Sequence, residues 1–288
     1  MTAAITVITP AFEAEAFVAQ AVRSVLVQGR ADWEMVIASD DGRDYLEILQ
    51  AQGIEDPRVR CVATGGVGTG AARARSSALE AARGRVIVSL DADDTLQAGA
   101  LEVIVPLALD HGAAYSDIAL VDFTSGRLLK NCNRRPPPGL QPLEDVLTSN
   151  LHTFAWIAID RERLPEVRWP DGIARWEDVL FFAACCDALG SLYFTPEPLY
   201  DYRKRAGSVC NRPEAAEEYR QAAEQIMRAL DTDRRLLALS AETRDLLRRF
   251  FRSRCRLEAL FARALETGEC AEYQEFLRDN LDLFYSLE

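Results

Sequence analysis

Two carboxylates stand two positions apart where a hydrophobic run of the sequence ends. The segment "VSLDADD" (88–94) carries Asp91, Asp93 and Asp94 directly after apolar residues. In an extended chain alternate side chains point the same way, so Asp91 and Asp93 share a direction and Asp94 faces the other side. This pattern favours a hard divalent cation, Mg²⁺ or Mn²⁺, held with substrate phosphates, although a solvated strand-to-helix turn is the simpler interpretation of so short a motif. Asp94 is expected to cap a helix, with Gln97 three residues later.

Two further acidic segments contain groups that could do chemistry. Asp41 follows an apolar run in "SDDGRD"; its carboxylate could accept from the N–H edge of a uracil or guanine ring, or close an Asx-turn. Of the adjacent pair, Asp40 is expected to be the turn residue. "RWEDVLFF" (175–182) places Glu177 and Asp178 at the start of an apolar helix, where acids either complement the helix dipole or serve catalysis.

The elements that must position these groups alternate between strand-like and helical patterns. Four β-branched runs are each followed by helical spacing: "AITVIT" (3–8), "WEMVIAS" (33–39), "VRCVAT" (59–64) and "RVIVSL" (85–90). The alternation predicts an α/β fold, a mostly parallel sheet with helices on both faces. Because ligands bind beyond the carboxyl ends of such strands, the segments after the runs are the predicted site, including the glycine-rich "TGGVGTG" (64–70).

Beyond residue 110 the alternation fades. Residues 113–123 and 126–130 predict a hairpin, and "TFAWIAID" and "SLYFTP" predict further strands on either side of a helix in "WEDVLFFAACCDAL". From about residue 213 the spacing of apolar residues is helical. The sequence therefore divides into an α/β part and a helical C-terminal extension.

Composition excludes several classes of protein. The 288 residues are 49% hydrophobic, and the formal net charge is −12, which argues against general binding to nucleic acid. Seven cysteines without C-x-x-C spacing predict neither a zinc site nor a disulfide framework. Without a signal-peptide pattern or an apolar run of about 20 residues, a cytoplasmic protein is expected, with possible contact to the inner membrane face.

Several segments together resemble family 2 glycosyltransferases of the GT-A fold. They are "ITPAFEAEAFVAQAVRSVLVQ", "DWEMVIASDDGRD", "GGVGTGAARARSSALEAARGRVIVSLDADDTL" and "WEDVLFF", in the family's order and spacing. The resemblance is close over residues 3–105, looser to about 210 and absent beyond. It implies a Rossmann-like sheet in a catalytic domain at 1–212, with a helical extension at 213–288.

The resemblance also implies an activity. A sugar would pass from a nucleotide-diphosphate sugar, with a UDP-sugar foremost, to a hydroxyl acceptor with inversion at the anomeric carbon. Mn²⁺ or Mg²⁺ would be the cofactor, and a saccharide or lipid-linked saccharide of bacterial polysaccharide or glycolipid synthesis would be the acceptor. Residues 1–110 would form the nucleotide-binding half and residues 111–212 the acceptor half.

Donor contacts are carried over onto matching positions of this sequence. The expected donor-binding residues are Thr9, Pro10, Phe12, Asp41, Gly66, Arg73, Asp91, Ala92 and Arg205. Among them, Asp41 and Arg73 would lie beside the base and Asp91 would face the ribose. Asp93 would hold the metal on the diphosphate. Arg205 stands near a position where the family often has histidine; it would neutralise phosphate charge, or be an exposed basic turn.

The acceptor side is expected around the start of the apolar helix. The resemblance makes Asp178 the catalytic base, since an acceptor hydroxyl must lose its proton as it attacks. Trp176 and Glu177 would contact the acceptor, although Trp176 could equally belong to the core. His152 could line the acceptor pocket or be a structural histidine.

The helical extension and two rival functions leave further alternatives open. The segment "RDLLRRFFRSRCR" (244–256) is basic around Phe250 and Phe251, so the extension could contact a membrane, pack on the catalytic domain, or form a homodimer. A sugar-nucleotide nucleotidyltransferase should show a basic glycine-rich loop after the first strand, and "TPAFEAEA" has none. A non-catalytic binding module would be expected to have lost Asp93 or Asp178.

Overall fold

A computed structural model describes residues 4–131, 136–149, 156–204, 215–270, 276 and 280. Its strands are β1 Ile5–Ala11, β2 Trp33–Ser39, β3 Val59–Ala63, β4 Val86–Ser89, β5 Thr95–Leu96, β6 Ala113–Asp122, β7 Leu128–Asn131, β8 Gly139–Gln141, β9 Ala158–Asp160 and β10 Leu192–Lys204. Its helices are α1 Val18–Leu26, α2 Tyr45–Ala51, α3 Ala71–Ala81, α4 Ala100–His111, α5 Leu143–Ser149, α6 Glu177–Leu189, α7 Ala215–Ala229, α8 Arg234–Leu237 and α9 Ala241–Thr267. Both the predicted hairpin and the predicted helix of the second half are present.

The strands form one sheet in the order β3-β2-β1-β4-β9-β6-β10-β5, with β7 beside β6 and β8 beside β10. The first four strands of the chain are parallel. The runs of β1, β2 and β4 are buried on both faces, as a covered parallel sheet requires, whereas β3 at the sheet edge is partly exposed. β9 lies antiparallel between β4 and β6, so the sheet as a whole is mixed. The predicted α/β fold is confirmed, and the carboxyl ends of β1, β2 and β4 meet at one edge.

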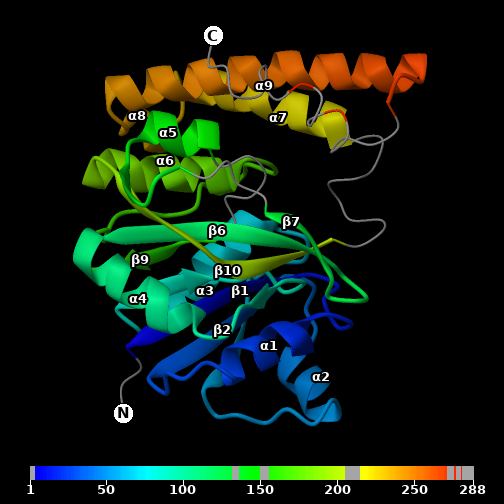
Figure 1. The fold of residues 1–288 in the computed structure, drawn as a ribbon, viewed down its shortest axis with the longest axis vertical. Coiled ribbons are helices and arrows are strands. Elements are labelled where there is room, and N and C mark those ends of the chain that lie inside the picture. Colours follow the sequence, from blue (N-terminus) through cyan, green and yellow to red (C-terminus); the bar gives the residue numbers. More distant parts are fainter. Residues whose placement is uncertain are drawn as a thin grey trace.

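Helices cover both faces of this sheet (Figure 1). One apolar cluster packs α1, α2 and α4 against the sheet, and another packs α3, α5 and α6 against the opposite face. Alternating residues of each strand supply the two clusters; in β1, Ile5 and Val7 join the first and Ile8 joins the second. The sheet edge is therefore held between two well-packed layers.

The C-terminal helices form a further layer on α5 and α6. In Figure 1, α7 and α9 lie beyond these helices on the side away from the sheet. Phe250 and Phe251 of α9 are 1% and 0% exposed within the same cluster as α6. Both rings are therefore buried by packing inside the protein, and contact of the extension with a membrane stays a prediction. No helix among the described residues has the length and apolar character needed to span a membrane.

Because this apolar cluster continues from α3 through α6 into α7 and α9, packing alone marks no gap between the two parts of the chain. The domain boundaries at 110 and 212 therefore stay predictions.

Candidate active site

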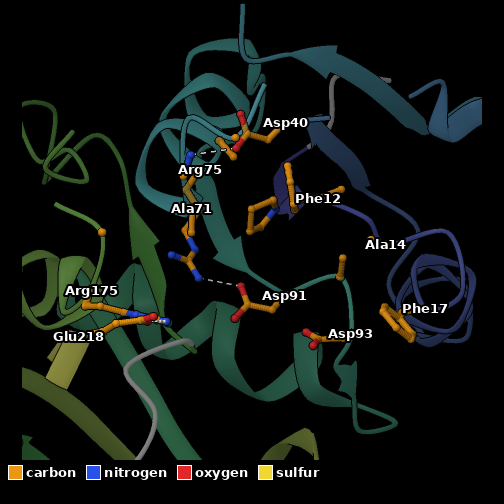
Figure 2. Close-up of a pocket in the computed structure, with 17 residues that line it drawn as sticks. Phe12, Ala14, Phe17, Asp40, Ala71, Arg75, Asp91, Asp93, Arg175 and Glu218 are labelled. Atoms are coloured by element: carbon orange, nitrogen blue, oxygen red, sulfur yellow. Dashed lines mark hydrogen bonds and ion pairs between the residues drawn. The ribbon is translucent and has the colours of Figure 1, made fainter. Parts of the chain in front are cut away.

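A cavity of about 600 Å³ opens at the carboxyl edge of β1, β2 and β4, a size typical of pockets for small-molecule ligands (Figure 2). It is lined by Pro10, Ala11, Phe12, Ala14, Phe17, Asp40, Gly68, Gly70, Ala71, Ala74, Arg75, Asp91, Ala92, Asp93, Ala174, Arg175 and Glu218. The strand ends supply one wall, the glycine loop and α3 supply a second, and the turn before α6 supplies a third.

The lining includes five of the residues expected from the sequence: Pro10, Phe12, Asp91, Ala92 and Asp93. Thr9 is buried within β1, and Gly66 lies in the glycine loop, which reaches the cavity through Gly68 and Gly70 instead. His152 and Arg205 fall outside the described residues. The donor roles given to these residues stay predictions.

Arg75 joins the two acidic segments of the site. Its side chain is 6% exposed; Nη2 lies 2.8 Å from Oδ1 of Asp91 and Nη1 lies 2.9 Å from Oε1 of Glu177. Small residues surround it on α3, including Ala71 and Ala74, and leave room for the guanidinium. One buried cation thus ties the end of β4 to the start of α6.

Arg73, two residues earlier, is placed differently. Its side chain is 39% exposed, and its nearest carboxylates, on Glu80 and Asp171, are 3.8 and 4.0 Å away. Arg73 is not among the residues that line the cavity. Its expected contact with the base stays a prediction, whereas Arg75 on the same helix lines the cavity.

Asp178 lies in the first turn of α6, beside Glu177. Burial, together with the charges of Glu177 and Asp91, raises the pKa of Asp178 to about 7, although Arg75 acts in the opposite direction. Its Oδ1 accepts a hydrogen bond of 2.8 Å from the N–H of Val179. A carboxylate with such a pKa can accept a proton near neutral pH.

Asp94 is wholly buried and does not cap a helix. Its carboxylate accepts from the Tyr200 hydroxyl at 2.6 Å and from the N–H of Arg203 at 2.8 Å. The prediction of a helix cap is wrong because residues 95–96 pair with β10 as β5, and α4 begins only at Ala100 after Gly99. Burial, with the neighbouring Asp93 and Asp91, raises the pKa of Asp94 well above its usual value.

Of the adjacent acids after β2, Asp41 accepts from the turn and Asp40 lines the cavity. The Asp41 carboxylate accepts a hydrogen bond of 3.1 Å from the N–H of Arg43 in the same turn. It accepts a second one, of 2.7 Å, from the N–H of Glu13. Asp40 lines the cavity and accepts from the N–H of Gly70 at 2.9 Å. The expectation that Asp40 closes the turn is therefore wrong, and the contact of Asp41 with a base stays a prediction.

A family model for glycosyl transferase family 2 matches residues 6–159, more than half of the chain. The chain belongs to this family. The family match confirms the resemblance seen in the sequence motifs.

Individual relatives agree with this membership. The chain is 30% identical to TuaG of Bacillus subtilis (strain 168), a putative teichuronic acid biosynthesis glycosyltransferase. The match runs over 188 residues and covers 61% of this chain and 71% of TuaG. It is also 30% identical, over 44% of its length, to WfgD of Escherichia coli, a UDP-Glc:alpha-D-GlcNAc-diphosphoundecaprenol beta-1,3-glucosyltransferase; this match spans 56% of WfgD. Both relatives are bacterial glycosyltransferases; TuaG is named for teichuronic acid biosynthesis, and WfgD is named for a diphosphoundecaprenol-linked sugar.

Solved structures share the fold. Residues 1–349 of S. aureus TarS in complex with UDP-GlcNAc superpose with a TM-score of 0.64 at 20% identity, covering 87% of this chain and 72% of that one. At this identity the likeness concerns the fold alone.

In this family 2 glycosyltransferase, Trp176 is half-buried and packs against the apolar cluster of α6 and the C-terminal helices. It has a left-handed backbone with φ of 67°, and its ring packs edge to face on Tyr219, Phe250 and Phe251. Its ring therefore has packing partners, while part of the side chain stays exposed. Contact of Trp176 or Glu177 with an acceptor stays a prediction.

Several lining residues of the glycosyltransferase were missed by sequence reasoning. Asp40 is next to the predicted Asp41, and Arg75 is two residues from the predicted Arg73. The sequence does not show which member of each pair is buried, and burial distinguishes them. Arg175 and Glu218 lie beyond the family match, and Glu218 is one of several acids on α7 with nothing in the sequence to single it out.

Proposed function

We propose that the chain transfers a sugar from a UDP-sugar to a hydroxyl of a saccharide or lipid-linked saccharide, with inversion, in bacterial polysaccharide or glycolipid synthesis. The observation that carries this proposal is the Arg75 junction, which links Asp91 at the cavity to Glu177 beside the raised-pKa carboxyl of Asp178. Asp91 at the cavity and Asp178, a carboxyl whose pKa is near 7, thus belong to one charged cluster.

The donor would occupy the cavity at the strand ends. Phe12 is 51% exposed there and offers a ring face to a nucleotide base, while Gly68 and Gly70 let a ligand approach the backbone closely. A UDP-sugar is favoured because WfgD is named for UDP-Glc and the TarS structure contains UDP-GlcNAc.

Asp93 would hold a divalent ion, Mn²⁺ or Mg²⁺. Among the described residues no group of three or more His, Cys, Asp or Glu side chains is arranged to bind a metal. Asp93 nevertheless fits the ion, because Mg²⁺ commonly takes one or two carboxylates and completes its shell with waters and substrate phosphates. When bound, such an ion neutralises negative charge on the diphosphate.

Asp178 would act as the base. The acceptor hydroxyl gives its proton to the Asp178 carboxylate as its oxygen bonds to the anomeric carbon. The bond from that carbon to the diphosphate oxygen breaks, and the diphosphate leaves with the electron pair. A single displacement of this kind inverts the anomeric configuration. Arg75 and Glu177 hold the first turn of α6 against the end of β4, so the base is fixed before the acceptor arrives.

The family match favours this transferase over the nucleotidyltransferase alternative, and the chain keeps both Asp93 and Asp178, which a binding module would not need. A cytoplasmic location, contact with the inner membrane face and a homodimer through the C-terminal helices stay predictions.

A thermal-shift screen tests the proposal. The protein is heated with UDP-, GDP- and dTDP-sugars, each with Mn²⁺ and with EDTA. We expect UDP-sugars to raise the melting temperature in Mn²⁺ and to lose most of that effect in EDTA, because a ligand that binds only the folded state stabilises it. No shift with any of these donors would contradict the proposal.

A further inference from the structure

The C-terminal extension reaches the wall of the cavity. Glu218 of α7 lines it, and its Oε2 lies 2.6 Å from Nη2 of Arg175, which lines it too. In Figure 2 the charged ends of these two side chains lie together at one side of the cavity. The extension therefore supplies part of the site itself.

The next residue of α7 holds the same turn. The guanidinium of Arg175 lies over the Tyr219 ring, 5.1 Å from its centroid. The Trp176 indole donates its N–H to the carbonyl of Tyr219 at 3.3 Å, and the two rings meet edge to face at 5.1 Å. Behind them, Phe250 and Phe251 of α9 close on the indole at 5.9 and 6.1 Å. Side chains from two helices of the extension thus enclose the turn.

This turn needs such support. Trp176 adopts φ of 67° and ψ of 13°, a left-handed conformation that L-residues other than Asn and Asp rarely adopt. Its carbonyl accepts a hydrogen bond of 3.2 Å from the N–H of Leu180, so Trp176 is also the N-cap residue of α6. The conformation of this one residue therefore sets the direction in which Glu177 and Asp178 leave the turn.

We propose that Glu218 and Tyr219 are positioning residues that hold the Arg175–Trp176 turn and thereby fix the position of Asp178 in the first turn of α6. The inference rests on the proposed function, because it assigns the base to Asp178. The family match ends at residue 159, so this contact is a property of the chain that the match does not describe.

Hydrogen exchange tests the positioning without any activity. Amide exchange over residues 177–182 is compared in Glu218→Gln, Tyr219→Ala and a matched control, Glu224→Gln, which removes an ion pair to Arg220 on the same helix. We expect exchange in this segment to quicken about ten-fold in the first two variants, as a loss of roughly 1.4 kcal/mol of local stability would produce. The control should leave it unchanged. Equal exchange in all three variants would overturn the proposal.

Kinetics test the consequence for catalysis. We expect Glu218→Gln to bind UDP with Mn²⁺ within about two-fold of the wild type in calorimetry, while kcat falls about ten-fold because the base is misplaced. Exchanging the charges, with Arg175→Glu and Glu218→Arg together, should restore kcat to within about three-fold of the wild type.

Three results would count against the positioning role. An unchanged kcat in Glu218→Gln, an equal loss of UDP affinity and kcat, or no recovery in the exchanged pair would each overturn it. Failure of the proposed function would show itself separately, as a wild-type protein that binds none of the nucleotide sugars, and the exchange experiment would still report on the turn.

Discussion

Replacing Arg75 with methionine removes the one cation that joins Asp91 to Glu177. The three side chains are 6%, 24% and 13% exposed, so little solvent screens them. At an effective dielectric constant of about 20, unit charges about 4 Å apart attract by about 4 kcal/mol. The cost of desolvating the arginine offsets part of this, and breaking a buried pair costs about 3–5 kcal/mol in measured cases.

We therefore expect Arg75→Met to lower the free energy of unfolding by about 3–5 kcal/mol, measured by urea denaturation at pH 7. The melting temperature should fall by about 6–20 °C, at about 2–4 °C for each kcal/mol in a chain of this size. Arg73→Met is the matched control on the same helix. Its exposed ion pairs are long, so its loss should stay below about 1 kcal/mol.

The pH dependence of this deficit has a defined sign. Arg75 lowers the pKa of Asp178, so its removal should raise that pKa further. A carboxyl whose pKa is higher in the folded state than in the unfolded state costs stability as pH rises through that interval. The deficit of Arg75→Met should therefore be larger at pH 8 than at pH 5.5. A deficit that equals that of Arg73→Met, or that does not change with pH, would refute the reasoning.

Three further predictions concern donor binding and sugar transfer. Asp93→Ala should abolish Mn²⁺-dependent binding of the nucleotide sugar in calorimetry, and unchanged binding would remove Asp93 as the metal ligand. Asp178→Asn should bind the donor normally and lose transfer by about 10²–10⁴-fold, the usual contribution of a general base; full activity would exclude that role. Because Asp178 must be ionised to accept a proton, wild-type kcat/KM should rise with pH through about 7. A flat profile between pH 5 and pH 8 would contradict this assignment.

The alternating pattern of the first 110 residues was enough to predict the parallel half of the sheet. Four runs of β-branched residues became β1 to β4. In β1, β2 and β4 the run is apolar because the strand is buried on both faces, whereas β3 lies at the sheet edge and is partly exposed. The antiparallel insertion of β9 between β4 and β6 was not predictable, since three residues carry no signal about their neighbours in space.

The strand ends also led to Pro10, Phe12, Asp91 and Asp93, all of which line the cavity. The sequence could not show which of two nearby residues of the same type lines the cavity. Arg73 and Arg75 have the same chemistry, and only packing shows that the second is buried against two carboxylates. The same limit applies to Asp40 and Asp41, whose carboxylates are separated by the course of the turn.

The extension was the least predictable part. Its helical spacing was clear, yet the basic residues around Phe250 and Phe251 suggested a membrane surface although both rings pack inside. Which apolar face meets which partner depends on long-range packing. The contact of Glu218 with the cavity depends on the same packing.

Anomalous diffraction at the manganese edge, from crystals soaked with UDP and Mn²⁺, tests the central claim most directly. We predict the strongest anomalous peak beside the Asp93 carboxylate, with diphosphate oxygens completing its shell and the uracil ring against Phe12. A manganese peak away from Asp93, or UDP bound outside the cavity, would contradict the account.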